Sequence, residues 1–135
     1  MNPQLTSRFR HYITDITQID NEHIDLLTAM SDLERSPELT DVEIASQIVT
    51  IVQMFEDHLH HEEQFMDSIN YPYIEYHKMQ HVEILIMLKT YRKSSPDAVT
   101  RYATHTLSEH FIAHIDQYDM QVADFVKNHY AKTKD

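Results

Sequence analysis

The chain has 135 residues, and its 22 acidic and 11 basic side chains give a formal net charge of −11. This acidity argues against nucleic acid and anionic membrane as partners, because both reward clustered lysine and arginine. The absence of cysteine excludes disulfides, thiolate metal sites and cysteine nucleophiles, and the absence of glycine excludes glycine-rich phosphate loops. Tight turns that need a positive φ must use asparagine or be avoided, so an all-α fold is expected.

The length predicts a single domain over residues 1–135. No apolar run approaches the ~20 residues of a membrane span, and the N-terminal segment lacks the apolar region of a secretory signal. We therefore expect a soluble, cytoplasmic protein. The sequence is compatible with a monomer but does not fix the oligomeric state.

Four helices are predicted after an N-terminal arm. Residues 1–17 show no clean period and are predicted to pack on the bundle as this arm. The first helix is predicted over about 19–35, because Pro37 disfavours helix in the residue before it. Thr40 and Glu43 form a capping-box pattern, so the second helix is predicted over about 41–68.

The segment Asn70-Tyr71-Pro72 interrupts the chain before the third helix, predicted over about 73–93. Ser95 is the predicted N-cap of the fourth helix, with Pro96 at its first position and an end near His129. Residues 130–135 are expected to be a frayed tail. Short connections favour antiparallel neighbours, so the predicted architecture is an up-down-up-down antiparallel four-helix bundle.

Histidines fall on positions that the apolar pattern assigns to the core. The chain contains 11 histidines, an unusual number for its length. Read in alternating steps of three and four, the inward stripe of each predicted helix includes at least one histidine. The inward polar residues on these stripes are His23, His58, Glu62, His77, His81 and His114. An unpartnered buried polar group costs about 1–3 kcal/mol, and metal coordination would remove that cost.

The spacing of these residues supports a shared site. His58 with Glu62, and His77 with His81, are four residues apart, so each pair diverges by only about 40° around a helix. His114 and Asp119 are five apart, about 140° on an ideal helix. Their convergence would need a local widening of the helix, or an aspartate that reaches in from the edge of the face. Any one such pair is common on solvated helices, but all four groups in register indicate a metal centre.

On these residues the chain resembles the hemerythrins, in particular the single-domain bacterial ones. The resemblance covers about residues 10–127. The matching segments are 19–23 (Ile-Asp-Asn-Glu-His), 58–66 (His-Leu-His-His-Glu-Glu-Gln-Phe-Met), Tyr71-Pro72 leading to His77 and His81, and His114 through Asp119. The resemblance implies two irons, one bound by three histidines and the other by two, with two carboxylates and a solvent-derived oxo or hydroxo group bridging them. The implied ligands are His77, His81 and His114 for the first iron, His23 and His58 for the second, and Glu62 and Asp119 as bridges.

The implied ligand set leaves the two irons unequal. Three histidines, two carboxylates and one bridging oxygen complete six positions on one iron, whereas the other has five ligands and one vacancy, where a small molecule can bind. In the family that molecule is dioxygen. Imidazole with carboxylate also suits manganese and zinc, so the choice of iron comes from the resemblance alone.

Three functions are compatible with the sequence. The first is reversible dioxygen binding for storage, delivery or sensing, with no catalytic residues. The second is a di-iron enzyme, such as a peroxidase, an oxidase, or a factor for nitric oxide or iron repair. Iron-repair relatives of the family tend to carry a glutamate in a HxxxE pattern as the last bridge, so Asp119 favours the oxygen binder. The third is a sensor or interaction domain whose state a partner protein reads.

One departure from the family concerns the position four residues before the last histidine. The family usually has tryptophan there, and this chain has His110 and no tryptophan. We expect His110 to face inward, either as a hydrogen-bonded core residue or as a group that makes the ligand pocket more polar. The residues predicted to wall the pocket are Phe55, Phe65, Met66, Phe111 and Ile115. The histidines predicted to be solvated, or partners of the ligands, are His11, His60, His61, His105 and His129.

Overall fold

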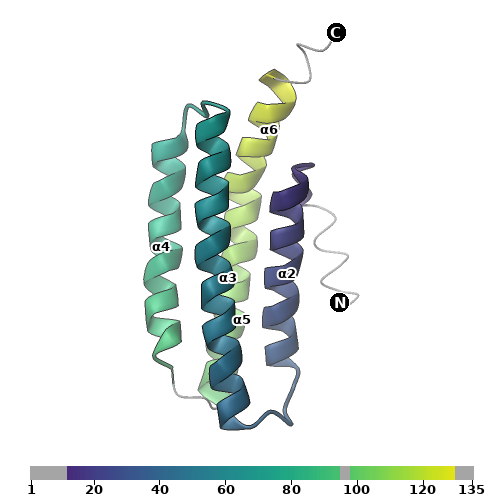
Figure 1. Ribbon diagram of the computed structural model, residues 1–135, viewed down its shortest axis with the longest axis vertical. Coiled ribbons are helices and arrows are strands. Elements are labelled where there is room, and N and C mark those ends of the chain that lie inside the picture. Colours follow the sequence, from purple (N-terminus) through teal and green to yellow (C-terminus); the bar gives the residue numbers. More distant parts are fainter. Residues whose placement is uncertain (1–11, 95–97, 130–135) are drawn as a thin grey trace.

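The computed structural model describes residues 12–94 and 98–129 and consists of helices joined by short connections (Figure 1). The elements are α2 (Thr17–Glu34), α3 (Asp41–Ser68), α4 (Ile74–Arg92), α5 (Ala98–His114), the π-helix η2 (Ile115–Asp119) and α6 (Met120–His129). The described ranges contain no strand. Each predicted helix is therefore present, the ends of the first three lie within about two residues of the expected ones, and the fourth is interrupted by the π-helix.

Successive helices run in opposite directions, as Figure 1 shows. Helix α2 packs on α3 and α5, and α4 packs on the same two helices, so the four form a ring around one interior. The predicted all-α antiparallel four-helix bundle is confirmed. Within the described residues, none of the helices has the length and apolar character needed to cross a membrane.

Local chemistry explains where the helices begin and end. The predicted capping box at the start of α3 is confirmed, because Thr40 Oγ1 accepts a hydrogen bond from the Glu43 backbone N at 3.2 Å. Glu43 Oε1 accepts one from the Thr40 backbone N in return, also at 3.2 Å. The turn after α3 places Asn70 at φ 54°, so asparagine does supply a left-handed turn in this chain without glycine. The predicted N-cap at Ser95 and Pro96 lies outside the described residues.

The segment before α2 is anchored to the first turn of that helix. Thr14 is buried, and both its backbone N (2.9 Å) and its hydroxyl (2.7 Å) donate to Asp20 Oδ1. The backbone N of Asp15, a second residue with positive φ (63°), donates to Asp20 Oδ2. Residues 12–16 of the predicted arm therefore pack on the bundle, while residues 1–11 and the predicted tail at 130–135 lie outside the described residues.

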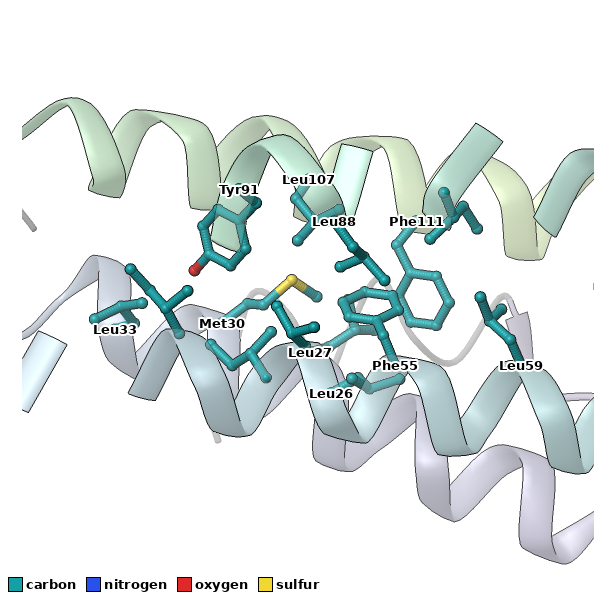
Figure 2. Close-up of a cluster of buried hydrophobic side chains, with 14 of the residues drawn as sticks. Leu26, Leu27, Met30, Leu33, Phe55, Leu59, Leu88, Tyr91, Leu107 and Phe111 are labelled. Atoms are coloured by element: carbon teal, nitrogen blue, oxygen red, sulfur yellow. The ribbon is translucent and has the colours of Figure 1, made fainter. Parts of the chain in front are cut away.

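Two apolar clusters fill the interior on either side of a polar layer. The larger cluster joins side chains of α2, α3, α4 and α5 and includes Leu26, Met30, Phe55, Leu88 and Phe111 (Figure 2). The smaller one, around Met66, Tyr71 and Val122, closes the end of the bundle where α3 ends and α4 begins. The inward histidines lie between these two clusters along the bundle axis. Apolar side chains therefore enclose them on both sides.

Candidate metal centre

The structure brings all seven predicted site residues into one buried layer. Each of them is at most 3% exposed, and they come from all four sides of the bundle. The residues are His23 from α2, His58 and Glu62 from α3, His77 and His81 from α4, His114 from α5, and Asp119 from η2. Their ligand atoms fall into two groups in which all atoms lie within 4.8 Å of one another, so each group could hold one metal ion.

The π-helix solves the spacing problem of His114 and Asp119. Five residues separate them, and a π-helix closes its turn with one more residue than an α-helix. The widened turn covers Ile115–Asp119, directly after His114. As a result, His114 Nε2 lies 3.1 Å from Asp119 Oδ1. The sequence allowed either a widened helix or an aspartate that reaches in from the edge of the face. The structure shows the widened helix.

The first group contains three histidines. His77 Nε2 lies 2.8 Å from Glu62 Oε1 and 3.1 Å from Asp119 Oδ1. His81 Nε2 lies 2.9 Å from the same Glu62 oxygen, and His114 Nε2 contacts the same Asp119 oxygen. Three imidazole nitrogens therefore surround one oxygen from each carboxylate.

The second group contains two histidines and the other oxygen of each carboxylate. His23 Nε2 lies 3.0 Å from Asp119 Oδ2, and His58 Nε2 lies 3.3 Å from Glu62 Oε2. Glu62 and Asp119 thus each direct one oxygen to the three-histidine group and one to the two-histidine group. Each carboxylate could therefore contribute one oxygen to an ion held by either group.

Two carboxylates outside the seven orient the histidines. His58 Nδ1 lies 2.8 Å from Glu22 Oε1, and His81 Nδ1 lies 2.8 Å from Glu63 Oε2. A carboxylate can only accept, so both Nδ1 atoms donate and keep their protons, and a metal ion at the centre would bind each ring through Nε2, which faces it. Each of the two groups therefore has one histidine fixed by a glutamate.

The electrostatics of the site favour positive charge. Burial by itself lowers a histidine pKa, but Glu22 and Glu62 outweigh it and raise the pKa of His58 to about 9. Asp119 and Glu62 likewise raise the pKa of His77 to about 9, and the pKa of His114 to about 10. Burial and Glu62 would raise the pKa of Asp119, yet His114 and His23 hold it below its usual range. Both carboxylates are thus ionised at neutral pH, and the layer attracts protons or metal cations.

Several buried polar atoms of the layer have no hydrogen-bond partner within the described part of the chain. They are His58 Nε2, His114 Nε2, Glu62 Oε2 and both carboxylate oxygens of Asp119. Buried polar atoms are normally satisfied, so this set needs a further binding partner. Imidazole nitrogens and carboxylate oxygens at this separation fit divalent or trivalent metal ions, and the residues present fit the two-metal site.

An aromatic wall lies against the two-histidine group. The fully buried ring of Phe111 meets His23 edge-on, with ring centroids 5.4 Å apart, and lies 5.8 Å from His58. Phe55 lies against Phe111 at 4.9 Å. Of the other residues predicted to form this wall, Ile115 belongs to the same apolar cluster as these rings. Phe65 and Met66 belong to the smaller cluster at the end of the bundle.

His110 does not lie in the core as expected. Its side chain is only partly buried and lines a niche of about 70 Å³ between α4 and α5, together with Gln80, Glu83 and the edge of His114. A residue one turn before His114 would face inward on an ideal helix, but here it lies on the α4 side of α5. The niche therefore adjoins the three-histidine group, whereas Phe111 adjoins the two-histidine group.

No sequence pattern predicted a role for Glu22 or Glu63. His61 was predicted to be solvated or a partner of the ligands, and its Nδ1 donates to Glu22 Oε2 at 2.7 Å. His105 bonds to Glu34 at 2.8 Å. In the sequence, only the position of Glu22 beside His23 suggests a role at the site. That position does not indicate which neighbouring helix the carboxylate faces.

Comparisons with known proteins agree with this site. Residues 14–126, most of the chain, match the hemerythrin HHE cation binding domain. Neither a curated protein nor a solved structure gives a significant match to the chain.

Proposed function

The chain belongs to the family of the hemerythrin HHE cation binding domain, and we propose that it binds dioxygen reversibly at a non-haem di-iron centre. The role would be oxygen storage, delivery or sensing. One observation carries the proposal: two shared carboxylates separate a group of three histidines from a group of two. Such an asymmetric site leaves one metal with fewer protein ligands, and a small molecule can bind there.

The seven buried donors would hold the two irons. His77, His81 and His114 would bind one iron, and His23 and His58 the other. Glu62 and Asp119 would bridge both irons, together with an oxo or hydroxo group from solvent. With that bridge the three-histidine iron would have six ligands and the two-histidine iron would have five. The open position would therefore lie on the side of His23 and His58.

The irons, when bound, supply the two electrons that reversible dioxygen binding requires. The protein side chains provide the surroundings. Phe111 and Phe55 present apolar edges beside the two histidines, which favours an apolar ligand over water. Glu22 holds the Nδ1 proton of His58 and keeps Nε2 directed at the centre.

A di-iron enzyme is the second candidate, and a polar approach to the three-histidine group favours it. The niche beside His114 is lined by the polar side chains Gln80, Glu83 and His110. Tyr118 lies against His114 with ring centroids 5.3 Å apart, and against the half-exposed Tyr76 at 6.0 Å. Proton and electron exchange through such a route would support a peroxidase or oxidase.

Metal analysis and an oxygen cycle would separate these functions. We expect two irons per chain, and a coloured species that forms when the reduced protein meets air and disappears when oxygen is removed. Several such cycles without loss of amplitude would support the carrier. Rapid bleaching with consumption of an added reductant would support the enzyme. A protein that takes up iron but shows neither behaviour would refute both, and zinc or manganese bound in preference to iron would refute the di-iron centre.

A further inference from the structure

The outer face of α4 is apolar, although a bundle helix normally turns a polar face to solvent. Within the described residues ten large hydrophobic side chains are exposed by 40% or more, and five of them lie on this one helix. They are Tyr76, Met79, Val82, Leu85 and Ile86, with exposures of 53%, 64%, 52%, 40% and 60%. The inner face of α4 is already buried through Ile84, Leu88 and the site histidines. A helix that is apolar on both faces is normally covered on both faces.

A groove continues this face toward α3. It has a volume of about 390 Å³ and is lined largely by apolar side chains, among them Val52, Val82, Leu85 and Ile86. Lys89 and Arg92 border it at the C-terminal end of α4. Among the described residues neither cation forms an ion pair. Glu56 lines the same groove, so both charge signs border this apolar strip.

The outer face of α4 has an exposed carboxylate near its start and two cations near its end. Glu75 lies in the first turn, where it makes only a long, exposed contact of 3.8 Å with Lys78. Lys89 and Arg92 lie in the last turn. A second α4 laid antiparallel on the first would therefore place its Lys89 and Arg92 near Glu75 of the first.

The apolar residues have the same symmetry. In an antiparallel pair centred near Val82, Met79 of one copy lies opposite Ile86 of the other, and Val82 lies close to its own counterpart. The same register places Glu75 of one copy opposite Lys89 of the other, so two ion pairs can form across the interface. Glu83 lies to one side, since it lines the separate niche beside α5. Apolar and charged positions thus complement themselves in a single register.

We propose that the outer face of α4 is the interface of a homodimer, in which two α4 helices pack antiparallel around a two-fold axis near Val82. A two-fold interface uses the same patch twice, so it must be self-complementary, and this face is. The strip contains both charge signs at its ends and does not offer the uniformly basic surface that nucleic acid or anionic lipid requires. The helix of 19 residues is only about 28 Å long, which predicts a small interface and a Kd on the order of 1–100 µM.

Sedimentation velocity of the metal-loaded full chain over a wide concentration range tests this proposal. We expect the mass to rise from 16.1 kDa toward twice that value with increasing concentration. Ile86→Glu places a buried, unpaired charge against Met79 of the other copy, twice in each dimer, so we expect Kd to increase at least about 100-fold. Tyr102→Glu changes a residue that is 74% exposed on α5 and should leave the mass unchanged. Circular dichroism and iron content verify that both variants fold.

A charge swap tests the register. Lys89→Glu alone is expected to weaken the dimer roughly tenfold, and the double variant Glu75→Lys/Lys89→Glu is expected to restore it. A monomer at all concentrations would overturn the proposal, and so would a dimer that Ile86→Glu leaves intact. A monomer that instead binds vesicles of phosphatidylcholine and phosphatidylglycerol through Ile86 would assign the face to a membrane and equally overturn it. None of these outcomes depends on the metal or on dioxygen, because the site residues lie on the opposite face of α4.

Discussion

Replacement of Glu22 by glutamine should weaken metal binding in the two-histidine group alone. Glu22 Oε1 accepts the His58 Nδ1 proton at 2.8 Å, and its other oxygen accepts from His61 at 2.7 Å. A glutamine keeps an acceptor but removes the charge, so His58 loses part of the polarisation that makes Nε2 a strong donor. Loss of such a supporting bond typically costs 10–100-fold in metal affinity, or about 1.4–2.8 kcal/mol. The charge that raises the pKa of His58 to about 9 would also be lost, so that pKa should fall.

The matched control is Glu63→Gln, because Glu63 supports His81 in the three-histidine group through the same 2.8 Å contact. Anaerobic ferrous titrations against a chromophoric chelator give two stepwise constants for each variant. His58→Ala assigns the steps, since it removes a ligand of one group only. We expect Glu22→Gln to weaken the step that His58→Ala removes, and Glu63→Gln to weaken the other. Equal effects on both steps, or no effect of either variant, would refute the assignment of one supporting glutamate to each metal.

Three further predictions follow from the same contacts. Phe111→Ala should lower the free energy of unfolding by about 3–5 kcal/mol in denaturant titrations, and should shorten the lifetime of any oxygenated form, because the ring is fully buried against His23. The metal-free protein should lose stability as pH rises from about 6.5 toward 9–10, because His58 and His114 have raised pKa values and retain protons that the unfolded chain releases. Thermal unfolding at several pH values measures this, and the metal-loaded protein should not show the loss. Thr40→Ala should cost about 0.5–2 kcal/mol, measured by thermal melts, because it removes the cap of α3.

The sequence alone determined the helices and their inward faces. Pro37 and the capping box at Thr40 act locally, so the ends of the first two helices could be predicted within about two residues. The inward position of His23 and His58 follows from the apolar period, because a stripe that packs against other helices must be buried whatever those helices are. Long helices with strong periodicity depend little on tertiary context.

Tertiary structure decided the features that depend on two elements at once. An ideal helix would separate His114 and Asp119 by about 140°. The π-turn brings the two side chains together, at the place where the other helices of the bundle present their own donors. Glu22 supports His58 across the contact between α2 and α3, and no local signal states which helices are neighbours. His110 lies one turn before a site residue, yet the packing of α4 against α5 places it at a surface niche. Periodicity sets which face of a helix is buried, whereas the partner of each buried atom is fixed only when the helices assemble.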